Sequence, residues 1–185
     1  SRRLLAAAGV PVPPFALVQD AAQVRRFARE HGYPILLKAV ASSMSRLVRL
    51  VAAEPEVDQA VARLQARLPA SADLQRLAGF AQAAGIETGC DPFRQFLTEG
   101  FAEGLPVECD GLLVGEEVRS FGMLEQVLSR DPPFFFEGYL LPASLAPADA
   151  EQVRSVAEAA VRAMGLADAG FAVEMRVGRA GGRVI

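Results

Sequence analysis

Two long strand patterns lie in the middle of the sequence, and only a short turn separates them. Residues 106–114 and 117–127 both read as extended strands, with Gly115 between them. A connection this short joins antiparallel neighbours, because a parallel crossover needs about a dozen residues or more. A helix pattern follows over residues 147–164, with apolar side chains at helical spacing on one face. This part of the chain is therefore expected to form an antiparallel sheet crossed by one helix.

The preceding part of the chain is expected to form a smaller α+β lobe over residues 13–98, followed by a larger lobe over residues 99–185. Residues 1–12 are interpreted as the end of a preceding helix and a proline-containing linker. Asp20 is the expected cap of the first helix in the small lobe. The small lobe is predicted to contain strands at 15–18, 34–40, 46–52 and 93–98 and helices at 20–30, 54–68 and 72–84. In the larger lobe we expect a break at 131–133, a strand at 170–177, a turn at 179–182 and a returning strand at 183–185.

The bulk composition limits the classes of partner. The 185 residues are 51% hydrophobic and 22% charged, which is typical of a folded globular chain. The net charge of −3 does not favour nucleic acid or an anionic membrane, and no apolar stretch approaches the roughly 18 residues of a membrane span. We therefore expect small-molecule partners, no nucleic acid and no membrane. Cys90 and Cys109 have neither disulfide-framework nor metal-ligand spacing, which favours reduced thiols and a cytoplasmic location.

Lys38 is the only lysine among 19 basic residues, and it stands at the end of a short apolar strand pattern. A chain that otherwise uses arginine and keeps one lysine here indicates a need for a compact ammonium, which suits a phosphate oxygen. Leu36 shares a strand face with Lys38 and would place an apolar wall beside the cation. The segment that follows can offer amide and hydroxyl donors to an anion, although it lacks glycine and also fits an ordinary hairpin turn. Its candidate ligands are Ser42, Ser43 and Ser45.

The segment that follows the strand pattern at 93–98 is a candidate site for a purine. It begins with an acid and continues as an extended apolar stretch, which can offer backbone N–H and C=O groups to the edge of a base. The other interpretation is a simple linker between the lobes. The candidate residues are Glu99, Gly100, Phe101 and Ala102.

The strand pattern at 170–177 carries an acid and a base on one face. Glu174 and Arg176 are two residues apart, so they form either a solvent-facing pair or the polar floor of a cleft. Carboxylate oxygen is the ligand that Mg²⁺ prefers, usually with one or two carboxylates and substrate phosphates. Glu174 is therefore a candidate metal ligand, and a second carboxylate is expected nearby.

Taken in order, these segments resemble the ATP-grasp superfamily over nearly the whole chain. Each resembles one motif of that family. Residues 8–13 look like "aGvPvP", 32–38 like "GyPvvvKp", 42–48 stand where "GSgSrGV" usually runs, 97–102 look like the adenine hinge "lvEefi", 108–113 like "sVDGlv", 173–174 like the strand with the first magnesium Glu, and 183–185 like the lead into "viEiNPR".

The resemblance implies an α+β fold of two lobes with the nucleotide cleft between them, and ATP and Mg²⁺ as cofactors. It implies that Lys38 and the serine loop contact phosphates, that Glu99 and the backbone after it contact adenine, and that Glu174 binds magnesium. Pro106 stands where the family often has a ribose-binding acid, so Glu103 or Glu108 is the candidate ribose ligand. Arg176 is the candidate catalytic residue and would hold an acyl phosphate or a carboxylate.

Residues 138–145 are similar to the branch of L-amino-acid and carboxylate–amine ligases. This similarity implies a ligase that forms an acyl phosphate with ATP and transfers the acyl group to an amine. The family's first lysine would precede Ser1 and its second metal-binding Glu would follow Ile185, so we expect an inactive piece of a longer protein. The oligomeric state stays open, a homodimer included. The alternatives are an enzyme of the biotin-carboxylase or carbamoyl-phosphate type and a non-catalytic nucleotide-binding module.

Overall fold

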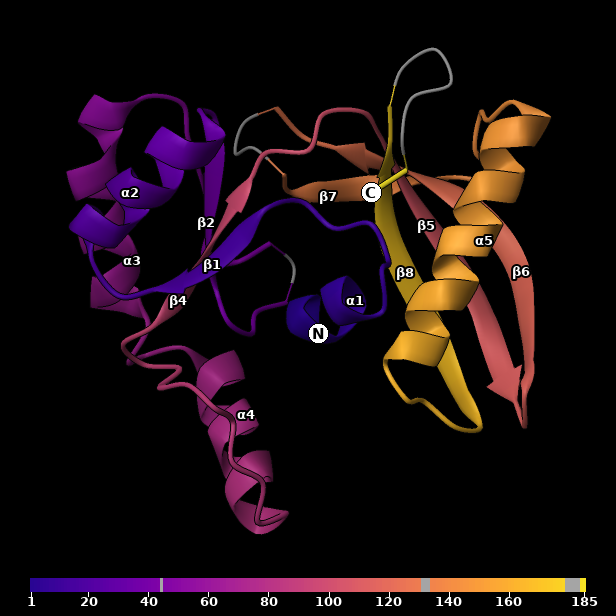
Figure 1. Cartoon of the computed structure of the whole chain (residues 1–185), viewed down its shortest axis with the longest axis horizontal. Helices are drawn as coiled ribbons and strands as arrows, with labels where there is room; N and C mark the ends of the chain where they lie inside the picture. The colour runs from indigo at the N-terminus through magenta and orange to yellow at the C-terminus, as the bar shows by residue number, and fades with distance from the viewer. Residues whose placement is uncertain (44, 131–133, 179–183) are drawn as a thin grey trace. The chain divides into compact units, whose positions relative to one another are not determined.

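The computed structural model describes residues 1–43, 45–130, 134–178 and 184–185. The predicted α+β class is confirmed, because helices accompany two four-stranded sheets whose neighbouring strands are all antiparallel. The chain divides into two compact units, Pro13–Phe101 and Ser1–Val12 with Ala102–Ile185 (Figure 1). Among the described residues, no helix has the length and apolar character that a membrane crossing requires.

The unit Pro13–Phe101 is built on a sheet with the strand order β1-β4-β2-β3. Helix α2 begins where predicted, because the Asp20 carboxylate accepts a hydrogen bond of 2.8 Å from the Gln23 amide. Helix α4 begins after Ser71, whose hydroxyl accepts from the Leu74 amide at 3.4 Å. The elements are β1 (Phe15–Val18), α2 (Ala21–His31), β2 (Ile35–Ala39), β3 (Val48–Val51), the 3₁₀ turn η1 (Glu54–Glu56), α3 (Val57–Arg67), α4 (Ala72–Ala83) and β4 (Phe96–Gly100).

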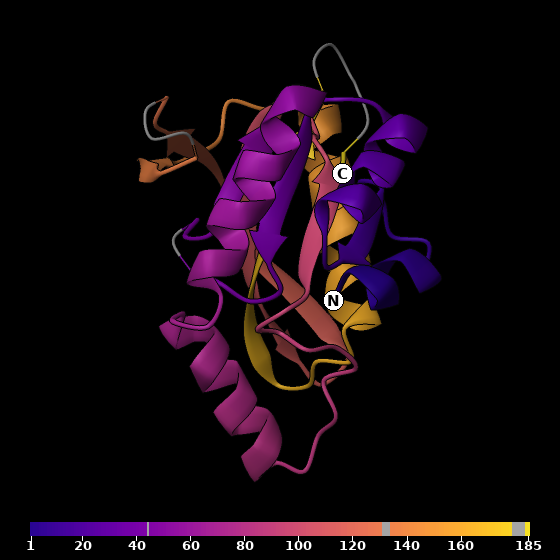
Figure 2. The ribbon, with the colours of Figure 1, turned by 90° about the vertical axis from the view of Figure 1, so that its left-hand side faces the viewer.

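Helices α2 and α3 cover one face of this sheet, and both lie on the same side of it in Figures 1 and 2. Their buried apolar side chains pack with Ile35 and Leu37 of β2, both of which are inaccessible to solvent. Leu36 and Lys38 alternate with them and therefore point to the opposite face, as predicted. The core includes Val24, Phe27, Ile35, Leu37, Val57, Val61, Leu64 and Phe96.

Strands β3 and β4 begin two and three residues later than the sequence predicts, and local turns explain both. Strand β4 begins at Phe96 because the Phe93 amide donates to the Asp91 carboxylate at 3.0 Å and the Gln95 amide donates to the Asp91 carbonyl at 2.8 Å. Strand β3 begins at Val48 because Ser45 and Leu47 have positive φ angles of 54° and 58°. Extended pairing therefore starts only after each turn.

The second unit carries a sheet with the order β7-β6-β5-β8, crossed by α5 on one face (Figure 1). Val153 and Ala157 of α5 pack against Val107 and Cys109 of β5 and Met175 of β8. The predicted strands and helix are present, whereas β7 was not predicted. The elements are α1 (Arg2–Ala7), β5 (Leu105–Val114), β6 (Glu117–Leu128), β7 (Phe136–Leu140), α5 (Pro147–Ala163) and β8 (Ala169–Val177).

The returning strand is seen at its described end only. The Arg176 amide donates to the Ile185 carbonyl at 2.8 Å, and the Ile185 amide donates back at 3.0 Å. Val184 forms an antiparallel bridge with Val177. The predicted turn at 179–182 and the predicted break at 131–133 lie outside the described residues.

Candidate functional site

Lys38 and Glu99 form an ion pair on the sheet face opposite α2 and α3. Lys38 Nζ lies 2.5 Å from Glu99 Oε2, and the two side chains are 25% and 3% exposed. The antiparallel register produces this meeting, because Glu99 of β4 stands opposite Leu36, one strand repeat from Lys38. Two candidates from distant parts of the sequence are thus brought together with Leu36 beside them.

The backbone that follows Glu99 is already partly used within the unit. The Gly100 amide donates to the Pro14 carbonyl at 2.9 Å, and the Phe101 amide donates to the Pro34 carbonyl at 3.2 Å. These two amides therefore do not face outward as donors for a purine. Ala102 is the next residue along the chain.

The serine-containing loop after β2 is exposed and contacts helix α4. The Ser43 amide and the Ser43 hydroxyl both donate to Asp73 Oδ2, at 3.0 and 3.1 Å. These hydrogen bonds lower the pKa of the Asp73 carboxyl, the amide contributing most. Ser42 and Ser45 are exposed neighbours in the same loop. The sequence analysis did not single out Asp73, since its only local signal is its place in the first turn of α4.

Glu108 and Glu174 stand opposite each other on β5 and β8, on the sheet face away from α5. Gln126 Nε2 donates to Glu108 Oε2 at 3.0 Å and to Glu174 Oε1 at 3.2 Å. The Tyr139 hydroxyl also donates to Glu108 Oε2, at 2.8 Å. Glu108 is only 7% exposed, so these donors offset the cost of burying its charge. The sequence analysis did not identify Gln126 and Tyr139 as site residues, because it did not predict β7. The pairing of β7 with β6 places Tyr139 opposite Gln126.

Asp110 adds a third carboxyl to this face. It lies two residues from Glu108 on β5, and its Oδ1 atom is buried with no hydrogen-bond partner in the part of the chain that the structure describes. Burial, then the Glu108 charge and a hydrogen bond with Glu108, raise the pKa of Asp110. A carboxyl in this condition resists ionisation more than an exposed one.

Arg176 lies on the same strand face as Glu174, as predicted from their spacing. Burial lowers the pKa of the Arg176 guanidinium, and the charge of Glu174 opposes that effect. Arg176 stands opposite Pro106 in the β5–β8 register. The face therefore combines two facing glutamates with one partly buried cation.

The carboxylates of this face have suitable chemistry for a hard cation, but they do not make a complete site. Carboxylate oxygens are the ligands that Mg²⁺ prefers, and Glu174 is exposed on its strand. Within the described ranges, no group of three or more His, Cys, Asp or Glu side chains could hold a metal ion. Glu174 therefore fits one ligand of a magnesium ion that also takes oxygens from water or phosphate.

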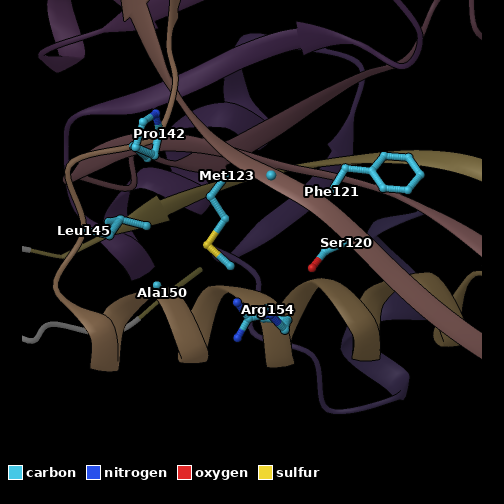
Figure 3. Close-up of a pocket in the computed structure, with 9 residues that line it drawn as sticks. Ser120, Phe121, Met123, Pro142, Leu145, Ala150 and Arg154 are labelled. Atoms are coloured by element: carbon cyan, nitrogen blue, oxygen red, sulfur yellow. The ribbon is translucent and has the colours of Figure 1, made fainter.

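A separate pocket of about 250 Å³ lies between β6, the segment after β7 and α5. Figure 3 shows Met123 reaching toward α5, where Ala150 and Arg154 line the opposite wall, with Leu145 at one side. None of the site residues predicted from the sequence lines this pocket.

Comparison with known proteins gives likeness in sequence and in structure. No family model matches the chain. It is 30% identical over 165 residues to the uncharacterized protein y4rH of Sinorhizobium fredii (strain NBRC 101917 / NGR234). The alignment covers 89% of this chain, which spans 30% of the length of that curated relative.

Three solved structures superpose on almost the whole chain. Carboxyaminoimidazole ribonucleotide synthase from Aspergillus clavatus, complexed with ATP, matches at a TM-score of 0.75 and 17% identity, over 100% of this chain and 41% of its own. Biotin carboxylase from Campylobacter jejuni matches at a TM-score of 0.72 and 20% identity, over 98% of this chain and 37% of its own. L-amino acid ligase from Bacillus licheniformis matches at a TM-score of 0.70 and 20% identity, over 97% of this chain and 36% of its own. At these identities the likeness shows a shared fold.

Proposed function

We propose that this chain, which has the ATP-grasp fold, binds ATP and acts in a ligase that joins a carboxylate to an amine through an acyl phosphate. The observation that carries the proposal is the ion pair between Lys38, the chain's only lysine, and the buried carboxylate of Glu99. This pair lies on the sheet face opposite α2 and α3. A buried pair is costly to maintain and is weak as a stabilising device. The presence of the single lysine in this pair is explained by a ligand that Lys38 contacts.

In the unit Pro13–Phe101, each candidate residue has a distinct proposed role. Lys38 neutralises phosphate charge, while Glu99 fixes the direction of the ammonium. Leu36 provides an apolar surface beside the base. Ser42, Ser43 and Ser45 offer hydroxyl or amide donors to phosphate. Because the Gly100 and Phe101 amides are used internally, we assign the donor to adenine to the amide of Ala102, the first residue after this unit.

In the second unit, Glu174 is the proposed magnesium ligand and Gln126 orients it. Bound magnesium would neutralise charge on the phosphates during transfer. Glu108, held by Tyr139 and Gln126, is the proposed acceptor for a ribose hydroxyl. Arg176 is the proposed anchor for the carboxylate substrate or its acyl phosphate, because a guanidinium can bind either in a bidentate manner.

The reaction then needs little covalent chemistry from the protein. A substrate carboxylate oxygen attacks the terminal phosphorus of ATP, the bond to ADP breaks, and an amine displaces phosphate from the acyl phosphate. Positioning and charge stabilisation supply most of such catalysis. Lys38 and Arg176 provide the positive charge from the chain itself.

A bicarbonate-using enzyme is the second candidate for the substrate class. The observation in its favour is the fold likeness to biotin carboxylase, which is as strong as that to the L-amino acid ligase. Bicarbonate would replace the organic carboxylate in the same phosphorylation step. Turnover that requires bicarbonate, and not an amino acid or other carboxylate, would identify this case.

The test of ligase function is formation of ADP by the full-length protein. ADP should form only when a carboxylate is present with ATP and Mg²⁺. Glu174→Gln should lower this rate by about a hundredfold or more, since even partners behind a metal ligand contribute about 10–100-fold. Glu158→Gln is the matched control, because Glu158 pairs with Arg162 on α5 and should leave the rate unchanged.

Full activity of Glu174→Gln would refute the metal assignment. ATP binding without ADP formation, over a broad set of carboxylates and bicarbonate, would favour a non-catalytic nucleotide-binding module.

A further inference from the structure

The donors of Ser43 are engaged by a carboxylate of the same unit. Both the amide and the hydroxyl of Ser43 donate to one oxygen of Asp73, thirty residues away in sequence. Arg46 Nη2 donates to the Ser43 hydroxyl oxygen at 3.3 Å, and Arg76 Nη1 lies 3.9 Å from the second Asp73 oxygen. An anion therefore sits among two hydrogen-bond donors and two arginines.

This arrangement is the one that a phosphate oxygen would use. A serine hydroxyl has a single proton and a backbone amide has one, so neither can serve Asp73 and a phosphate fully at once. Two hydrogen bonds to an ionised oxygen are also stronger than neutral ones. A phosphate can gain these donors only after the Asp73 carboxylate leaves them.

We propose that Asp73 occupies the anion-binding position of Ser43 and competes there with the phosphates of a nucleotide. The proposal rests on the proposed role of Ser43 in phosphate binding. It makes Asp73 an internal anion that lowers affinity for phosphate-bearing ligands. Affinity for the nucleoside alone should not depend on Asp73, because adenosine brings no phosphate to these donors.

The test compares ATP and adenosine binding by calorimetry in the wild-type protein and in Asp73→Ala and Asp73→Asn. ATP affinity should rise about fivefold or more in Asp73→Ala, the lower end of measured couplings between linked sites. Adenosine affinity should stay the same. Ser71→Ala weakens the same helix end without removing a charge, and Glu87→Gln removes a carboxylate elsewhere in the unit. Both controls should bind ATP as the wild type does.

A second measurement, hydrogen exchange of the Ser43 amide without ligand, tests the contact itself. Exchange should be faster in Asp73→Ala than in Ser71→Ala. The proposal would be overturned if the Ser43 amide is equally protected in the wild type and in Asp73→Ala. It would also be overturned if the wild type binds ATP and Asp73→Ala binds it with the same affinity. If neither the wild type nor any variant binds ATP although Ser43 exchanges faster in Asp73→Ala, the proposed nucleotide function fails, and the competition fails with it.

Discussion

Among single residues, Tyr139 is a probe of the carboxylate face, the sheet face of the second unit that carries Glu108, Asp110 and Glu174. Partial desolvation of this 43% exposed side chain, with the hydrogen bond to Glu108 and the charge of Glu108, raises the pKa of the Tyr139 phenol to about 12. A raised pKa means that the folded state prefers the protonated phenol. Its contribution to stability is therefore present below about pH 10 and is lost as the pH rises toward about 12.

Ultraviolet titration can follow the Tyr139 phenol directly, because the chain has only two tyrosines. Subtracting the titration of Tyr139→Phe leaves the curve of Tyr139. Glu108→Gln should move this curve toward the ordinary range near pH 10, whereas the exposed Glu116→Gln should not. A Tyr139 curve that is unaffected by Glu108→Gln would show that the two side chains do not interact in solution.

Several single residues could be found from the sequence, because each stands out locally. Lys38 is unique by count, and Glu174 shares a predictable strand face with Arg176. Asp73 and Gln126 could not be found in this way. Their importance comes from contacts with residues far away in sequence, which only the strand register and the position of α4 create.

At the scale of elements, the β5–β6 pair contains an irregularity that depends on glycine. The register of the pair shifts between Asp110 and Gly111. A Cβ atom at Gly111 would overlap both the Arg119 carbonyl oxygen and the Phe171 ring. The glycine therefore permits a close approach of three strands beside the carboxylate face.

Gly111→Ala should lower the free energy of unfolding by about 1–3 kcal/mol, the usual cost of overpacking. Gly170→Ala is the matched control on the next strand, since its added Cβ would lie 3.7 Å from Leu112 Cδ2 in ordinary contact. Denaturant unfolding of both variants measures the difference. Equal stability of the two variants would contradict the close packing at Gly111.

Most elements could be predicted from the sequence, because their signals are local. The Asp20 cap and the apolar spacing of 147–164 each define a helix. Strand β7 was missed, since its pairing with β6 is a long-range event and its own residues alternate weakly. The late start of β4 depends on the side chain of Asp91, which competes with extended pairing.

At the scale of the whole molecule, the order of two α+β units along the chain is what relates it to known folds. Three solved structures superpose on 97–100% of this chain, and the chain spans 36–41% of their length. The fold class could be predicted because it follows from the order of elements. The substrate could not be predicted, because no contact among the described residues identifies it.

The proposed binding of nucleotide phosphate by Lys38 can be measured by calorimetric titration of the full-length protein with Mg–ATP. Lys38→Ala should weaken binding about tenfold or more, the loss expected for a hydrogen bond to a charged group. Lys38→Arg should restore little of the ATP affinity, because a planar guanidinium does not replace a compact ammonium. The exposed Arg49→Ala, opposite Leu37 on β3, should bind as the wild type does. Wild-type ATP affinity in a folded Lys38→Ala protein would contradict the account.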